Sequence, residues 1–280
     1  MFHLFTRTIA GVCCSVLVAV TCVLPQVVQA QGPSTIGNLL WYKDWHRDGR
    51  GVVENPKVIG HGGWQKFKKV FSGGDGIIYA ITQEGDLLWY KDWRRDGTGV
   101  VENPKVIGHG GWQMFRNVFY GGDGIIYAIT REGDLLWYKD WRRDGTGVVE
   151  NPKVIGHGGW QMFRNVFCGG DGIIYAITQE GNLLWYKDRH RDGTGVVENS
   201  KLIGNGGWQM FRNVFSGGYG IIYAITQEGN LLWYKDSHCD GTGEVADPKV
   251  IGHGGWQAFK EVFGAENGVI YAITAGLRDS

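Results

Sequence analysis

The sequence contains little cysteine, little proline and no excess charge of either sign. Of 280 residues, five are cysteine and six are proline, and 28 lysine and arginine residues balance 28 aspartate and glutamate residues. A formal net charge of zero creates no long-range field that would attract a nucleic-acid backbone, so we expect no nucleic-acid partner. Only Cys168 and Cys239 lie beyond residue 30. No disulfide framework is therefore visible, and a single bridge between these two cysteines stays open.

Long helical periods are also missing, whereas glycine and aromatic residues are abundant. Glycine occupies 47 positions, about 17% of the chain against a usual ~7%. The glycines follow no three-residue period, which excludes collagen, and the hydrophobic content of 43% is too high for a disordered chain. The composition indicates a folded protein built from short strands and turns.

The first thirty residues have the pattern of a secretory signal peptide. Arg7 precedes an apolar run over residues 9–28, and Val28-Gln29-Ala30 places small residues where signal peptidase cleaves. A membrane anchor is the alternative, because the run approaches the length of a membrane span. Polar residues and a proline interrupt the run, so we expect cleavage after residue 30. The mature protein would then be secreted, or periplasmic or at the cell surface in a bacterium, without a membrane partner.

One unit of 48 residues is repeated along the rest of the chain. The tryptophan of a Trp-Tyr-Lys-Asp motif recurs at this spacing as Trp41, Trp89, Trp137, Trp185 and Trp233. The tryptophan of a Gly-x-Gly-Gly-Trp motif recurs at the same spacing. Residues 89–136 and 137–184 differ at only three positions. The copies should therefore fold alike.

Each unit contains four short apolar or β-prone runs. In one copy they cover residues 87–91, 105–107, 115–119 and 125–130. Glycine-rich turns separate the runs, and no stretch carries a helical period that could compete with them. Four strands in about 40–50 residues is the size of one propeller blade.

The two ends of the repeated region are half-repeats. Residues 256–274 would supply two strands and residues 38–60 the other two, which together complete one blade. Closure of this kind leaves no unpaired sheet edge, whereas an open solenoid would need polar capping repeats. We therefore predict an all-β, five-bladed propeller of four-stranded blades over residues 38–274, closed by N- and C-terminal half-repeats. Residues 31–37 would form a short leader and residues 275–280 a tail.

The repeated sequence resembles the tachylectin family over residues 38–274. The resemblance rests on residues 107–112, Ile-Gly-His-Gly-Gly-Trp, with Phe115, Phe119 and Tyr127 and their counterparts in the other copies. It implies a five-bladed propeller lectin that binds N-acetylated amino sugars, N-acetylglucosamine or N-acetylgalactosamine, at one site per blade. The chain departs from the family pattern between the Trp-Tyr-Lys-Asp strand and the Gly-Gly-Trp loop. There the family has a Pro-rich segment that contains Asp-Asn-Trp-Leu, and this chain does not.

The Gly-Gly-Trp loops are the first candidate sugar-binding site. An indole ring can stack on the apolar face of a sugar, and glycine N–H groups can bond an acetamido oxygen. The alternative is that each tryptophan only packs between blades. Histidine precedes the glycines in four copies and asparagine in one, which favours a polar ligand contact or a turn role over catalysis. The candidate residues are His61, Gly62, Gly63, Trp64, His109, Gly110, Gly111, Trp112, His157, Gly158, Gly159, Trp160, Asn205, Gly206, Gly207, Trp208, His253, Gly254, Gly255 and Trp256.

A second candidate set contains a tryptophan that only three copies carry. Trp45, Trp93 and Trp141 follow Lys-Asp, but Arg189 and Ser237 take their place in the other two copies. A core position would not accept all three residue types, so we expect an exposed blade rim. These tryptophans would either tune sugar affinity or be tolerated surface residues.

The third candidate set is a recurring aspartate before a glycine, namely Asp48, Asp96, Asp144, Asp192 and Asp240. The segment from Asp92 to Glu102 resembles a calcium loop. Arg94 occupies the third ligand position and Glu102 falls one residue early, so we interpret Asp96-Gly97 as a turn and expect no metal ion.

No catalytic motif emerges from the sequence. A catalytic centre is normally unique in a chain, whereas nearly every polar residue here recurs three to five times. We expect no catalytic residue, no cofactor and no enzymatic activity. The sequence predicts a secreted, multivalent lectin for N-acetylhexosamine-bearing glycans. A protein-interaction scaffold is the first alternative, and a propeller hydrolase is the second, by analogy of fold alone.

Overall fold

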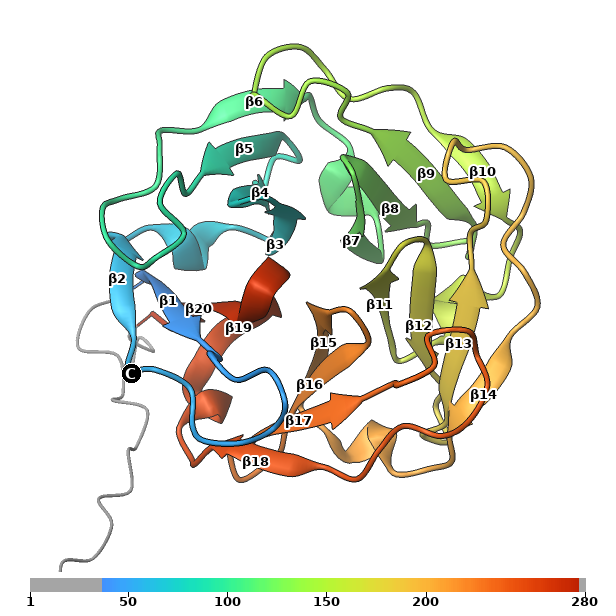
Figure 1. The fold of residues 1–280 in the computed structure, drawn as a ribbon. Helices are drawn as coiled ribbons and strands as arrows, with labels where there is room; N and C mark the ends of the chain where they lie inside the picture. Colours follow the sequence, from blue (N-terminus) through green and yellow to red (C-terminus); the bar gives the residue numbers. More distant parts are fainter. Residues whose placement is uncertain (1–36, 277–280) are drawn as a thin grey trace, which may run out of the picture.

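Five four-stranded antiparallel sheets surround a central axis in the computed structural model, which describes residues 37–276 (Figure 1). The expected signal peptide, nearly all of the leader and the last four residues of the expected tail lie outside the described residues. The helical segments within residues 37–276 are all short 3₁₀ turns, with no α-helix among them. None of these segments is long and apolar enough to cross a membrane. The predicted all-β, five-bladed propeller is confirmed.

Each blade is built from the axis outwards. The innermost strands are β3 (Lys69–Gly74), β7 (Asn117–Gly122), β11 (Asn165–Gly170), β15 (Asn213–Gly218) and β19 (Phe259–Gly264). The second strands are β4 (Ile77–Ile81), β8 (Ile125–Ile129), β12 (Ile173–Ile177), β16 (Ile221–Ile225) and β20 (Val269–Thr274). The third strands are β5 (Leu87–Lys91), β9 (Leu135–Lys139), β13 (Leu183–Lys187), β17 (Leu231–Lys235) and β1 (Leu39–Lys43). The outermost strands are β6 (Lys105–Gly108), β10 (Lys153–Gly156), β14 (Lys201–Gly204), β18 (Lys249–Gly252) and β2 (Lys57–Gly60).

We number the blades along the chain as blade 1 (β3–β6), blade 2 (β7–β10), blade 3 (β11–β14) and blade 4 (β15–β18). The remaining sheet, which we call the closing blade, has the order β19-β20-β1-β2. In it Trp41 of β1 lies opposite Tyr271 of β20. The two half-repeats therefore complete one sheet, as the sequence predicts, and the ring closes without an unpaired edge between them.

The core lies between the blades, because both faces of each sheet are covered by a neighbour. In β12, Ile173, Tyr175 and Ile177 pack against residues of blade 4, whereas Ile174 and Ala176 pack against blade 2. Successive side chains of a strand point to opposite faces, so a strand buried on both faces reads as a continuous apolar run. The repeated Ile-Ile-Tyr-Ala-Ile sequence follows from this requirement.

The third predicted run starts two residues later than expected. Gly111 has a left-handed backbone with φ of 85°, and the chain then enters the 3₁₀ turn η2 (Trp112–Met114). The corresponding turns are η1 (Trp64–Lys66), η3 (Trp160–Met162), η4 (Trp208–Met210) and η5 (Trp256–Ala258), and η6 (Glu266–Gly268) precedes β20. Phe115 follows the turn and packs its ring 5.7 Å from that of Trp112, so it belongs to the junction rather than to the strand.

A buried hydrogen bond joins each blade to the next. The hydroxyl of Tyr127 in blade 2 donates to Oδ2 of Asp188 in blade 3 at 2.7 Å. The bonds Tyr79–Asp140, Tyr175–Asp236, Tyr223–Asp44 and Tyr271–Asp92 repeat it at 2.7 to 2.9 Å around the ring. Burial and the adjacent Asp188 carboxylate raise the pKa of Tyr127 well above its ordinary value, which keeps the donor protonated. The last two bonds involve the closing blade, so they help to hold the two chain ends in the ring.

Candidate functional site

The tryptophans of the Gly-Gly-Trp loops fill the junctions between blades. Trp64, Trp112, Trp160, Trp208 and Trp256 are all buried, with 2 to 6% of their surface exposed. The ring of Trp160, which follows blade 2, lies 4.7 Å from that of Tyr186 in blade 3 and 5.6 Å from that of Phe163. The equivalent burial of Tyr138 beside Trp112 raises its pKa to about 12, so the phenol stays neutral at physiological pH. Packing between blades is therefore one role of these tryptophans.

Two different constraints account for the glycines of these loops. A Cβ at Gly156, the first glycine of the motif, would lie 2.5 Å from Nε1 of Trp160, so a side chain there would displace the indole. A Cβ at Gly158 or Gly159 would meet nothing within 4 Å, but these residues have φ of 60° and 85°. The glycine pair thus serves a left-handed turn, and only the first glycine allows close approach to the ring.

Part of the hydrogen-bonding capacity of each loop is used within its own blade. The N–H of Gly158 donates to Oδ1 of Asp134 at 2.9 Å, and the N–H of Trp160 donates to the carbonyl of Gly133 at 3.2 Å. Both acceptors belong to the turn between β8 and β9. In the other copies the side-chain acceptor is Asn38, Asp86, Asn182 or Asn230. These two backbone donors are therefore already satisfied.

The loop after β10 forms one wall of a cleft between blades 2 and 3, which we call the Ser200 cleft. It has a volume of about 510 Å³ and is lined by residues 156–160 and 196–200 together with Phe163 and Tyr186. The second wall comes from the connection between β13 and β14, where the N–H of Val197 donates to the carbonyl of Ile155. The candidate loop of one blade thus meets a long loop of the next blade.

The same surfaces enclose much less space between blade 4 and the closing blade. There residues 52–56 face His253 and Trp256 across a cavity of about 20 Å³. Pro56 occupies the position of Ser200, and three further copies also carry proline, as Pro104, Pro152 and Pro248. Ser200 instead places a hydroxyl near the side chain of Tyr186, where proline has no polar group. The two clefts are therefore unequal in size and in polar lining.

The Ser200 cleft combines an aromatic base with polar groups at its edge. His157 is exposed, and neither its side chain nor that of Asn199 hydrogen-bonds any other residue within 37–276. Glu198 also lines the cleft and pairs with Arg189. These groups provide donors and acceptors beside Trp160 and Tyr186, an arrangement that suits a small polar ligand with one apolar face.

The rim tryptophans are exposed, as the sequence predicts, and each is held in place. Trp45, Trp93 and Trp141 expose 65%, 68% and 71% of their surface. Their Nε1 atoms donate to Glu54, Glu102 and Glu150 at 2.7 to 2.9 Å. The Nζ atoms of Lys43, Lys91 and Lys139 lie 5.0 to 5.1 Å from the ring centroids. In the other copies Arg189 pairs with Glu198, and Ser237 accompanies Ala246, so the tryptophan occurs only where a glutamate acceptor is present.

The recurring aspartates bind their own turns. Oδ1 of Asp192 accepts the N–H of Thr194 at 2.8 Å, and Asp96, Asp144 and Asp240 make the same contact with their threonines. The hydrogen bond from the Thr194 side chain lowers the pKa of Asp192, and Arg50 lowers that of Asp48 to about 2. These carboxylates therefore stay ionised and bound locally, as expected of a turn residue.

The aspartate turns and the Gly-Gly-Trp loops lie at opposite ends of the outermost strand. Lys153 at the start of β10 donates Nζ to the carbonyl of Asp192, whereas His157 follows the end of that strand at Gly156. Asp192 is absent from the lining of the Ser200 cleft. The structure thus separates these two candidate sets. It adds residues 196–200, whose sequence signal was the serine in place of proline.

No group of three or more histidine, cysteine, aspartate or glutamate side chains within the described part of the chain could hold a metal ion. Cys168 and Cys239 are both free thiols.

The chain has weak structural relatives and one clear family match. A search of curated proteins finds no significant match. A solved symmetrical protein, described in a study of how folding constraints shape de novo evolutionary emergence, is 22% identical and has a TM-score of 0.51, covering 81% of this chain and 99% of its own. Prp20p from Saccharomyces cerevisiae is 14% identical with a TM-score of 0.40, covering 80% of this chain and 59% of its own. Human WBSCR16 is 14% identical with a TM-score of 0.41, covering 81% and 61%.

The similarity to the first of these structures concerns the fold alone. The family match concerns the sequence, since the model of the Tachylectin family matches residues 33–245, more than half of the chain. Together with the five blades and their repeated Gly-Gly-Trp junctions, this match shows that the chain belongs to the tachylectin family.

Proposed function

We propose that this protein is a secreted, non-enzymatic lectin that binds N-acetylhexosamine-bearing glycans in the clefts between its blades. The Ser200 cleft carries the proposal, because it is an open space of about 510 Å³ in which aromatic and polar side chains meet. Its volume falls within the range of about 300–1,000 Å³ that is typical of small-ligand sites. Membership of the tachylectin family supports a carbohydrate ligand.

The side chains of this cleft suggest how an amino sugar would bind. The partly exposed ring of Tyr186 offers apolar surface to a pyranose face, and Trp160 adds the small part of its ring that reaches the cleft. Asn199 and His157 are free to hydrogen-bond hydroxyl or acetamido groups. Two loop N–H groups already have partners, so side chains would make more of these contacts than the glycine backbone.

Because the inter-blade clefts differ in volume, we expect the sugar-binding sites to differ in affinity. The Ser200 cleft would bind most strongly, and clefts with proline at this position would bind weakly or only within extended glycans. Several weak contacts to one glycan-coated surface can still raise avidity by ~10²–10⁴ where the geometry allows simultaneous engagement.

Isothermal titration calorimetry with N-acetylglucosamine, N-acetylgalactosamine and glucose tests this proposal. We expect binding of at least one amino sugar and none of glucose. Ser200→Pro installs the residue of the sister copies, so the fold should survive while binding falls. Asn199→Ala should weaken binding, whereas the matched change Asn55→Ala in the smaller cleft should not. Absence of heat with both amino sugars at millimolar concentration would overturn the proposal.

Export is tested separately. Amino-terminal sequencing of the protein released from its host should give a start at Gln31. An intact terminus in a membrane fraction would instead support the anchor.

A protein-interaction scaffold is the second candidate function. It is favoured by the exposed tryptophans at the blade rim. Trp45, Trp93 and Trp141 lie on three consecutive blades and are exposed and fixed. Exposed aromatic residues of this kind are common in protein interfaces. A scaffold would retain a protein partner in the presence of excess free amino sugar, whereas a lectin would release its glycoprotein ligands.

A further inference from the structure

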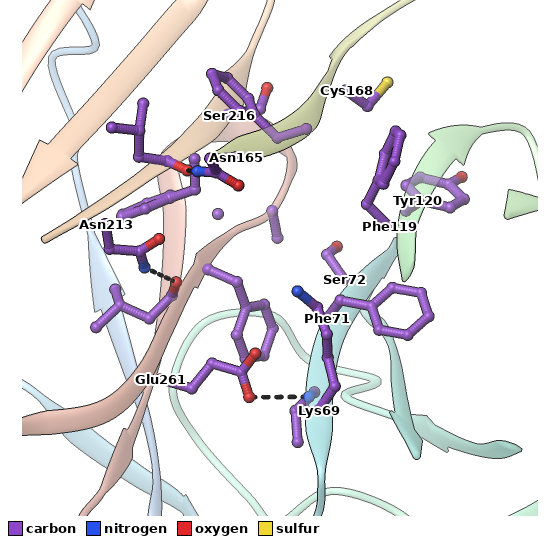
Figure 2. Close-up of a pocket in the computed structure, with 18 of the residues that line it drawn as sticks. Lys69, Phe71, Ser72, Phe119, Tyr120, Asn165, Cys168, Asn213, Ser216 and Glu261 are labelled. Atoms are coloured by element: carbon purple, nitrogen blue, oxygen red, sulfur yellow. Dashed lines mark hydrogen bonds between the residues drawn. The ribbon is translucent and has the colours of Figure 1, made fainter. Parts of the chain in front are cut away.

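The innermost strands enclose a cavity of about 590 Å³ on the propeller axis (Figure 2). We call it the axial cavity. Each innermost strand pairs with a neighbour on one side only, so its other edge faces this space. At one position of the wall the five copies carry Lys69, Asn117, Asn165, Asn213 and Glu261. The cavity therefore departs from fivefold symmetry.

The polar groups of the wall are largely satisfied across the blades. Asn165 and Asn213 donate Nδ2 to the carbonyls of Val214 and Val262 at 2.7 and 2.8 Å. Lys69 donates to Oδ1 of Asn117, and Glu261 accepts the N–H of Val70 at 2.9 Å. These contacts hold the innermost strands together and leave the mouth of the cavity as the place where unpaired charge remains.

Basic residues occupy one repeat position in all five blades, next to one mouth of the axial cavity, and we call this set the cation ring. It consists of one repeat position, directly before or at the start of the innermost strand, occupied by Lys68, Arg116, Arg164, Arg212 and Lys260. Lys68, Arg212 and Lys260 line the cavity, and all five residues are exposed. The position is always basic, although the next residue along the chain is lysine, asparagine or glutamate.

The ring cations form no ion pairs with acidic side chains of the described residues, although the neighbouring Glu261 carboxylate acts electrostatically on Lys260. None of the five forms an ion pair with another residue of the described range 37–276, and only Lys260 has a hydrogen-bonded side chain, to the carbonyls of Gln65 and Phe67. Near the other mouth, two arginines from the loops after the third strands pair with aspartates in the turns between the first and second strands. Arg143 lies 3.0 Å from Asp75, and Arg191 lies 2.9 Å from Asp123. The molecule therefore neutralises one arginine set and leaves the other free.

Five like charges around one axis repel each other, and an anion on the axis would relieve that repulsion at every blade together. A singly charged anion would engage one or two side chains, whereas a ligand with several anionic groups could engage the whole ring. The cavity volume lies within the range of small-ligand sites. Arginine binds phosphate and sulfate oxygens in a bidentate manner, and three of the five ring residues are arginine.

We propose that this ring binds one compact polyanion with three or more phosphate or sulfate groups, on the axis and apart from the inter-blade clefts. The site is formed once per molecule, because all five blades contribute to it. It does not depend on the proposed lectin activity.

Calorimetry at low ionic strength with inositol hexakisphosphate, tripolyphosphate and inorganic phosphate tests this site. We expect one site per chain and affinity that falls in that order, since the number of charges falls. Raising the salt should weaken binding, as for any exposed ionic contact. Free N-acetylglucosamine should not compete, which separates this site from the clefts.

Arg116→Gln, Arg164→Gln and Arg212→Gln should each weaken tripolyphosphate binding by roughly fivefold, the loss expected of one exposed ionic contact. The matched control is Arg131→Gln, which removes one positive charge from the turn between β8 and β9, where Gln83, Gln179 and Gln227 stand in the sister copies. It should leave binding unchanged.

Three results would overturn the proposal. They are no binding of hexakisphosphate at low salt, an equal loss in Arg131→Gln, and binding of long polyanions such as heparin or RNA without binding of hexakisphosphate. The last result would indicate a diffuse electrostatic surface. A circular-dichroism melt of each variant should match that of the unaltered protein, so that a loss of binding is not a loss of folding.

Discussion

The junctions between blades repeat almost unchanged, whereas the surfaces at the axis and at the rim differ from copy to copy. Each junction packs a tryptophan ring against a tyrosine ring in a tilted arrangement, with the ring centroids 4.6 or 4.7 Å apart in all five places. By contrast, one axial position is occupied in turn by Ser72, Tyr120, Cys168, Ser216 and Gly264. A close-packed interior tolerates little change of volume, while a solvent-facing surface tolerates much. Differences between blades, and with them unequal binding sites, therefore arise on the surfaces.

The largest effect should come from opening a junction. Trp160→Ala removes a buried indole that contacts Phe163 and Tyr186, and it should reduce the free energy of unfolding by ~3–5 kcal/mol. Chemical denaturation monitored by fluorescence measures this loss. A change of under about 1 kcal/mol would mean that Trp160 is not a packing residue, because surface substitutions have effects of that size.

A smaller loss should follow from cutting one bond between blades. Tyr127→Phe keeps the ring but leaves the buried Asp188 carboxylate without its hydroxyl donor, which should cost about 1–3 kcal/mol. The change removes one oxygen and creates almost no cavity, so the loss reports the hydrogen bond. Unchanged stability in the same denaturation experiment would show that the bond contributes little to holding blades 2 and 3 together.

Replacing Glu261 in the wall of the axial cavity should increase the stability of the protein, in contrast to the two previous changes. Burial raises the pKa of Glu261, and Lys69 only partly offsets this. An acid whose pKa is higher in the folded state destabilises the fold progressively as the pH rises from its unfolded-state pKa to its folded-state pKa. Glu261→Asn, which installs the residue of three sister copies, should therefore stabilise the protein near neutral pH. The gain should disappear below pH ~4, where the carboxyl is protonated in both states. A gain independent of pH would contradict this account.

The smallest effect on stability should come from the rim. Trp141→Ala removes an exposed side chain, so the free energy of unfolding should change by less than about 0.5 kcal/mol. Binding separates the two interpretations of this residue. A weaker signal on a glycan array would assign it to sugar contact, and an unchanged signal would make it a tolerated surface residue. A large loss of stability in Trp141→Ala would show that the rim tryptophan, like the junction tryptophans, is needed for packing.

Much of the fold could be predicted because every copy supplies the same information. The continuous apolar run at residues 125–129 appears as strand β8, and the half-repeats pair as β1 with β20. The start of the strand near Phe115 was misplaced, since an aromatic residue after a glycine turn can join a strand or a junction. Its local sequence does not distinguish these outcomes, and the packing against Trp112 and Tyr138 does.

The candidate site was less accessible to sequence reasoning. Trp160 and Trp141 both follow short polar or glycine segments, yet one is 6% and the other 71% exposed. The difference depends on which part of a neighbouring blade covers each ring. Likewise, Ser200 and His157 are 43 positions apart and meet only because the long loop of blade 3 reaches back to blade 2.

By itself, the sequence determined the number of blades, their four strands and the closure of the ring, because period, alternation and half-repeats are properties of one chain read in order. Tertiary structure alone decided which tryptophan is buried, which cleft is open and which arginines stay unpaired. Each of these outcomes depends on which part of a neighbouring copy of the repeat covers the residue, and the sequence of a single copy does not contain that information. Glu261 shows this, since it accepts the N–H of Val70 in the next blade.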